Sequence, residues 1–234
     1  MGQAITAAAP ASETKVNVFL AKIYLLMFVG LAITGIVSYF VSEYTQFETR
    51  LATNPALVWA LFIVQVIVVH VISARVMKIA PGAGVILFLF YAALTGVAIS
   101  SIFLLYSDDQ IYTVFLITSA TFLVSGGIGL IIKKDMSGSG HFLFMLLTGW
   151  FLAWLASWFF SWITGQALTN LNWALNFIGI AIFVALTAWD TNQLKKMGQQ
   201  IDSHPHGGGL VVIGALKLYL DYINLFLLLL RASR

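Results

Sequence analysis

The feature that most constrains this chain is a series of long apolar stretches separated by short polar segments. A helix that crosses a lipid bilayer needs about 20 mostly apolar residues. Seven stretches meet this requirement, at 19–41, 55–77, 83–106, 111–132, 141–164, 172–194 and 210–231. Only 9% of the residues are charged, against about 25% in soluble domains, so the apolar excess is expected to face lipid.

Helices are the expected form of these stretches, because backbone groups in lipid must form hydrogen bonds within their own segment. A closed β-barrel would require strands that alternate between apolar and polar residues. Runs such as LLMFVGLAITGIVSYF, at 25–40, do not alternate. We therefore predict an all-α integral membrane protein, in which 1–18 is a disordered polar tail and 19–234 forms one domain of seven transmembrane helices.

The orientation follows from the basic residues, which concentrate on one side of the predicted bundle. That side carries Lys15, Lys22, Arg75, Lys78, Lys133, Lys134, Lys195 and Lys196, and the other carries Arg50, Arg231 and Arg234. Since short cytoplasmic loops are enriched in Lys and Arg, we predict a cytoplasmic N-terminus and a C-terminus on the far side. The last stretch contains Lys217 and Asp221, which leaves a re-entrant segment as an alternative.

The composition also restricts partners and cofactors. The net charge is +3, but the basic residues lie in loops between apolar runs, so we expect contact with a lipid bilayer and not with nucleic acid. The chain has no cysteine, which excludes disulfides and thiolate metal sites. No segment outside the apolar stretches is long enough to carry separate chemistry.

Two carboxylates lie inside the apolar stretches. Asp190 stands in ALTAWDTNQLKK, and Asp221 stands in LKLYLDYIN. An ionisable side chain within a membrane costs several kcal/mol, at about +2.5–3.5 kcal/mol on insertion scales, and usually marks a functional site. The two residues belong to consecutive antiparallel helices and lie at similar depths, so we expect them to meet.

Two close carboxylates in an apolar interior can share a proton, because both cannot ionise at low cost. They can also bind a hard divalent cation such as calcium. Thr187 and Asn224 lie one helical turn from Asp190 and Asp221 and offer supporting oxygens. Arg75, at the end of the second stretch, is a candidate to pair with the two acids.

A purely structural interpretation is the alternative. Lys217 precedes Asp221 by four residues, so the two side chains can pair on the surface of a single helix. Asp190 can likewise extend toward Lys195 or Lys196 at the membrane boundary. In that case the charges would stabilise the helices and would carry no further function.

Three segments resemble the Bax inhibitor motif family of membrane proteins. The sequence ALKLYLDYINLFLLLLR, at 215–231, resembles the C-terminal signature of the family, while IAIFVALTAWDTNQLKKMG and YAALTGVAISSIF resemble its sixth and third helices. The resemblance runs from about residue 20 to the end and is greatest for bacterial members. It implies six helices around a central seventh, and a pH-sensitive calcium-leak channel whose sensor aspartates match Asp190 and Asp221. Arg75 is the nearest match to an arginine that latches onto that pair.

Three other functions are alternatives. An intramembrane aspartyl protease also uses two aspartates, but its Gly-x-Gly-Asp motif is missing here. A retinal-binding pump would use Lys217, which lies near the start of its helix instead of the middle. A stress-response or protease-regulating partner without transport stays open. We expect a bacterial inner-membrane protein that is not an enzyme, needs no cofactor and interacts with calcium and protons, while its protein partners are not specified.

Overall fold

The computed structural model describes residues 12–132, 136–201 and 207–233, and this part of the chain contains helices and no strand. The helices are α1 (Glu13–Tyr44), α2 (Phe47–Thr53), α3 (Pro55–Arg75), α4 (Pro81–Ile99), α5 (Ile102–Leu105), α6 (Asp108–Ile131), α7 (Ser137–Thr164), α8 (Thr169–Gln199) and α9 (Gly207–Ala232). Within the described residues, seven helical segments are long and apolar enough to cross a membrane, and α5 continues the one that begins with α4. The predicted all-α membrane architecture is confirmed.

Local sequence explains where several helices begin and end. Asn54 caps α3 by accepting a hydrogen bond from the backbone of Ala56, and Pro55 occupies the first turn, where no backbone donor is needed. Ser107 caps α6 in the same way, with two aspartates in the first turn that complement the helix dipole. Gly165 ends α7 in the left-handed region, with φ of 67°, which glycine adopts without strain.

The N-terminal boundary differs from the prediction. Helix α1 begins at Glu13, so the expected disordered tail is wrong for residues 13–18. Two features favour helix there: Glu13 places a negative charge in the first turn, and Val16 is buried in the core. The rest of the predicted tail, 1–11, lies outside the described residues.

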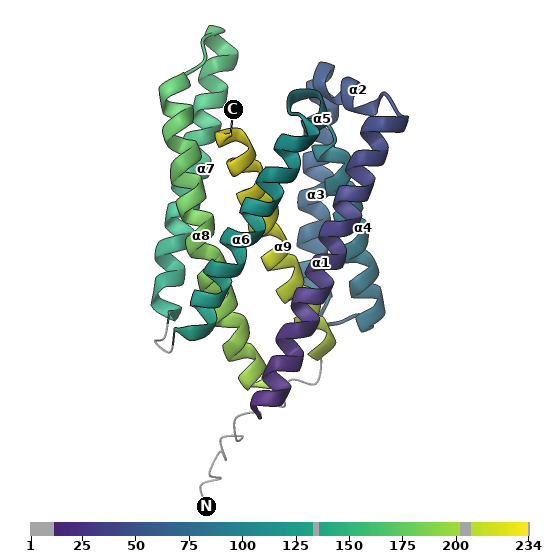
Figure 1. Ribbon diagram of the computed structural model, residues 1–234, viewed down its shortest axis with the longest axis vertical. Coiled ribbons are helices and arrows are strands. Elements are labelled where there is room, and N and C mark those ends of the chain that lie inside the picture. The colour runs from purple at the N-terminus through teal and green to yellow at the C-terminus, as the bar shows by residue number, and fades with distance from the viewer. Residues whose placement is uncertain (1–11, 133–135, 202–206, 234) are drawn as a thin grey trace, which may run out of the picture.

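Helix α9 lies at the centre of the bundle, as predicted (Figure 1). It packs against α1, α4, α6 and α8, whereas α3 packs on α4 and α7 packs on α8. A larger share of α9 is buried than of any other spanning helix. It is continuous over 26 residues, or about 39 Å, which exceeds the roughly 30 Å of a hydrocarbon core. The geometry therefore favours a full span over a re-entrant segment.

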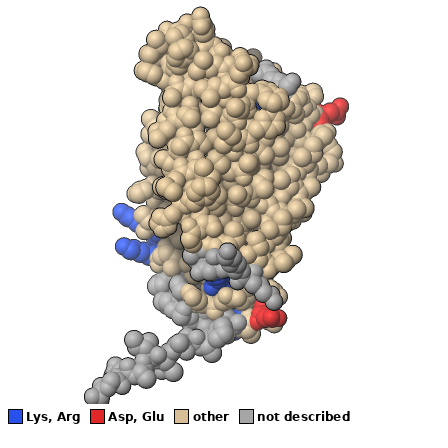
Figure 2. All heavy atoms as spheres, turned by 90° about the vertical axis from the view of Figure 1, so that its left-hand side faces the viewer, with Lys and Arg blue, Asp and Glu red and all other residues tan. Residues whose placement is uncertain are grey.

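The outer surface fits a lipid environment. Large apolar side chains are exposed along α3 and α7. On the face shown in Figure 2, a broad band carries almost no charge, and basic side chains gather in the lower half of the view. Lys133, Lys134 and Arg234, which entered the predicted orientation, lie outside the described residues. The orientation itself stays a prediction.

Candidate functional site

The two aspartates meet between α8 and the central helix α9. Only 7% of Asp190 and 5% of Asp221 is exposed, and the two carboxyl groups are close enough to interact electrostatically. We call these two residues the acid pair. The antiparallel packing of α8 on α9 brings them to the same depth, as the sequence predicted. Their function as a pH sensor stays a prediction.

A lysine from α9 completes the site. The Lys217 Nζ donates a hydrogen bond to the Asp190 Oδ1 at 3.1 Å and lies 5.5 Å from the centre of the Trp189 ring. The side chain of Lys217 thus links α9 to α8 through an ion pair. The purely structural interpretation had expected Lys217 to pair with Asp221 on its own helix. The Lys195 Nζ, another expected partner of Asp190, donates instead to the backbone carbonyl of Leu130.

One oxygen of the acid pair has no partner. The Oδ2 of Asp221 is buried and accepts no hydrogen bond among the described residues. An unpaired buried polar atom is costly, about 1–3 kcal/mol, unless a proton, water or ion satisfies it. With both carboxyls ionised, two negative charges would face the single positive charge of Lys217. The site therefore has an acceptor and a charge imbalance that a proton or a cation can relieve.

Among the described residues, the acid pair supplies fewer protein ligands than a resident calcium site needs. No group of three or more acidic, histidine or cysteine side chains forms within the described part of the chain. Calcium takes six to eight oxygen ligands, of which two carboxylates supply at most about four. Water or other oxygens would have to complete the shell, which is compatible with weak, transient binding.

Small residues on α6 allow the helices beside the acid pair to approach closely. A Cβ at Gly129 would collide with the backbone carbonyl of Ala188, two positions before Asp190. A Cβ at Gly126 would contact the hydroxyls of Tyr24 and Thr191. Glycine at these two positions therefore permits the close packing of α6 against its neighbours.

Three other predicted site residues form no hydrogen bond or ion pair with the acid pair within the described part of the chain. The Thr187 hydroxyl donates to the carbonyl of Phe183, and the Asn224 amide donates to the carbonyl of Leu220, both within their own helices. Arg75 is exposed at the end of α3 and forms no ion pair with either aspartate among the described residues. Its function as a latch stays a prediction.

Sequence reasoning missed a buried hydrogen-bond cluster on another side of α9. The Tyr219 hydroxyl lies 2.6 Å from the Thr34 hydroxyl, which itself donates to the carbonyls of Gly30 and Ala92. Tyr219 is fully buried, two positions from Asp221. This cluster joins α9 to α1 and α4. Its signal in the sequence is limited to Thr34 and Tyr219, because α4 contributes only the backbone carbonyl of Ala92.

The fold and the site define a polytopic, all-α integral membrane protein with a buried acid pair between its last two helices. The chain belongs to the family described as "Inhibitor of apoptosis-promoting Bax1", whose model matches residues 16–233. This finding confirms the resemblance to the Bax inhibitor motif family.

Bacterial relatives match over nearly their whole length. The inner membrane protein YbhL of Escherichia coli strain K12 is 40% identical over 215 residues, which cover 91% of this chain and 89% of the relative. A protein of Borreliella burgdorferi is 37% identical over 216 residues, covering 92% and 90%. A membrane protein of Streptococcus pyogenes serotype M3 is 34% identical over 222 residues, covering 94% and 93%.

Proposed function

We propose that this protein is a pH-sensitive calcium-leak channel of a bacterial inner membrane, with its N-terminus in the cytoplasm and no enzymatic activity. The observation that carries the proposal is the acid pair, buried between α8 and the central helix and paired with Lys217. The family resemblance supports the same function. The similarity to an inner membrane protein of Escherichia coli supports the location.

The proposed gate works through the charge of the acid pair. When the carboxyls are ionised, Lys217 or a passing calcium ion compensates them and holds α8 against α9. When a proton binds, that attraction weakens and the balance between closed and open conformations shifts. Because α9 packs against four other helices, a displacement of α9 would change the packing of most helices in the bundle.

Calcium is the transported ion in this proposal. Along the proposed path it is bound briefly by oxygens of Asp190 and Asp221, and the unpaired Oδ2 of Asp221 is the first available ligand. Arg75 enters the proposal as an alternative cation for the acid pair. Helix α3, which carries Arg75, has one buried residue in its spanning segment, Ile72, so movement of α3 would break few core contacts.

The test is calcium flux into liposomes that contain the purified protein and a trapped calcium indicator. We expect flux above that of empty liposomes, with a rate that changes across a series of pH values. A matched preparation of the Asp221→Asn variant should retain the fold but lose the change with pH. Absence of flux at every pH would overturn the channel proposal and favour a stress-response or protease-regulating partner without transport.

A further inference from the structure

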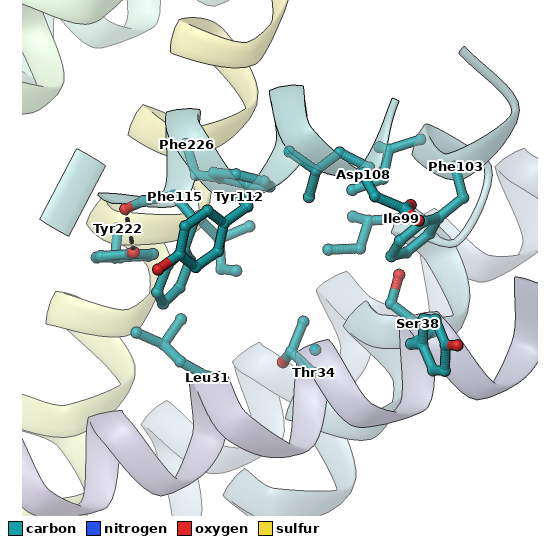
Figure 3. Close-up of a pocket in the computed structure, with 15 residues that line it drawn as sticks. Leu31, Thr34, Ser38, Ile99, Phe103, Asp108, Tyr112, Phe115, Tyr222 and Phe226 are labelled. Atoms are coloured by element: carbon teal, nitrogen blue, oxygen red, sulfur yellow. Dashed lines mark hydrogen bonds between the residues drawn. The ribbon is translucent and has the colours of Figure 1, made fainter. Parts of the chain in front are cut away.

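A lateral cavity of about 430 Å³ lies beside α9 (Figure 3). Its lining includes the start of α6, at the end of the bundle that carries the C-terminus (Figure 1). Its walls come from α1, the α4–α5 segment, α6 and α9, and most of the lining is apolar. The volume is within the usual range for small-molecule sites, about 300–1,000 Å³. We call it the lateral cavity. It is distinct from the acid pair, which lies between α8 and α9.

The buried hydroxyls around the lateral cavity are paired within the protein, with one exception. Thr34 is bonded to Tyr219, and Tyr222 is bonded to Ser119 and to the carbonyl of Phe115. Ser38 is 2% exposed, yet its hydroxyl has no partner among the described residues. A helical serine usually bonds to the carbonyl one turn earlier, so an unpaired hydroxyl facing a cavity is unusual. In Figure 3 this hydroxyl points from α1 into the cavity.

The rim of the lateral cavity has the residues expected at the boundary between hydrocarbon and headgroups. Tyr39 and Tyr112 flank the cavity from α1 and α6, and both are more than half exposed. Tyrosine is enriched at this depth in membrane proteins. Asp108, in the first turn of α6, adds a negative charge to the same lining. The cavity therefore combines an apolar interior, one unpaired hydroxyl and an acidic mouth.

We propose that the lateral cavity binds a phospholipid with an amine headgroup from the leaflet on the side of the C-terminus. One acyl chain lies along the apolar walls, where it makes van der Waals contacts with the lining side chains. The Ser38 hydroxyl donates to an ester carbonyl of the lipid, which satisfies its missing hydrogen bond. The ammonium of the headgroup pairs with Asp108. The lipid surrounds the protein, and an amine carries the charge that Asp108 requires.

This proposal goes beyond the proposed channel function and does not depend on it. The bound acyl chain would contact Tyr222, the residue after Asp221 on α9. The lipid site and the acid pair thus both include residues of α9. Lipid binding can nevertheless be measured without calcium or a pH change. Failure of the channel proposal would therefore leave the lipid site untouched, and the reverse also holds.

The test uses the full chain in liposomes that contain a phosphatidylethanolamine with a photoactivatable diazirine on its acyl chain. After irradiation, labelled peptides are mapped by mass spectrometry. We expect concentrated labelling of the cavity walls in α1 and α6, above the general labelling of the lipid-facing helix α3. Gly35→Leu should remove this excess, because Gly35 lines the cavity and a Cβ there meets only open space.

Two further variants make the outcome decisive. Gly127→Leu is the matched control: Gly127 is on α6 outside the cavity lining, a Cβ there also meets open space, and the excess should persist. With a phosphatidylglycerol probe of identical chains, labelling should fall by about 1.4- to five-fold, the range for an exposed ion pair. Asp108→Asn should abolish that preference. Equal labelling of the cavity walls in Gly35→Leu and Gly127→Leu would overturn the site, and equal labelling by both probes would overturn the amine headgroup.

Discussion

Replacement of Lys217 by methionine should destabilise the protein in a pH-dependent way. The substitution keeps most of the apolar stem but removes the cation that pairs with Asp190 at 3.1 Å. Exposed ion pairs contribute about 0.2–1 kcal/mol, whereas breaking a buried pair costs about 3–5 kcal/mol. The side chain of Lys217 is 41% exposed and that of Asp190 is 10% exposed, so the pair is intermediate. We expect a cost of about 2 kcal/mol.

The direction of the pH dependence follows from the chemistry of the pair. Lys217 stabilises the fold only while Asp190 is charged, so its contribution is present at mildly alkaline pH and is lost as acid protonates Asp190. At alkaline pH, the Lys217→Met variant should unfold at a melting temperature about 4–8 °C below that of the wild type. The difference should shrink on acidification, because a protonated acid pair needs no cation.

The assay is thermal unfolding in detergent, followed by tryptophan fluorescence at several pH values. Lys195→Met is the matched control, since the Lys195 Nζ donates to a backbone carbonyl, which does not titrate over this range. Its effect should be the same at every pH. Combining Lys217→Met with Asp190→Asn completes a double-mutant cycle. An equal loss of stability at acidic and alkaline pH, or a coupling energy near zero, would refute the reasoning.

Two further predictions use the same assay. Gly129→Leu should cost about 1–3 kcal/mol, because its side chain would force α6 away from the backbone of Ala188, while Gly127→Leu, which meets open space, should leave the melting temperature nearly unchanged. Tyr219→Phe should cost about 0.5–1.5 kcal/mol by removing the 2.6 Å hydrogen bond to Thr34, and the loss should not vary with pH, because neither hydroxyl titrates near neutrality.

Much of the fold could be predicted from the sequence, because the membrane imposes a minimum length on each apolar helix. The expected second span, 55–77, and the observed helix Pro55–Arg75 agree closely, since a capping Asn54 and a helix-starting Pro55 mark the start. The start of α1 was missed because residues 13–18 are polar in composition. The charge of Glu13 in the first turn and the burial of Val16 against the core explain why the helix extends so far.

The candidate site was partly predictable for the same reason. Asp190 and Asp221 are conspicuous in apolar runs, and the connection between their helices sets them at one depth. The partner of Asp190 was not predictable, because sequence spacing identifies Lys217 only as a neighbour of Asp221 on the same helix. Which face of α9 turns toward α8 is decided by packing of the whole bundle, as is the contact between Tyr219 and Thr34, 185 positions apart.

The most direct test of the central claim is the pH profile of liposomal calcium flux for the wild type beside Asp190→Asn and Asp221→Asn. Each asparagine keeps the size of the side chain but removes its charge and its titration. We predict that wild-type flux changes with pH, and that both variants give a flat profile at equal protein content. A wild-type profile reproduced by both variants would contradict the claim that the two buried acids sense pH.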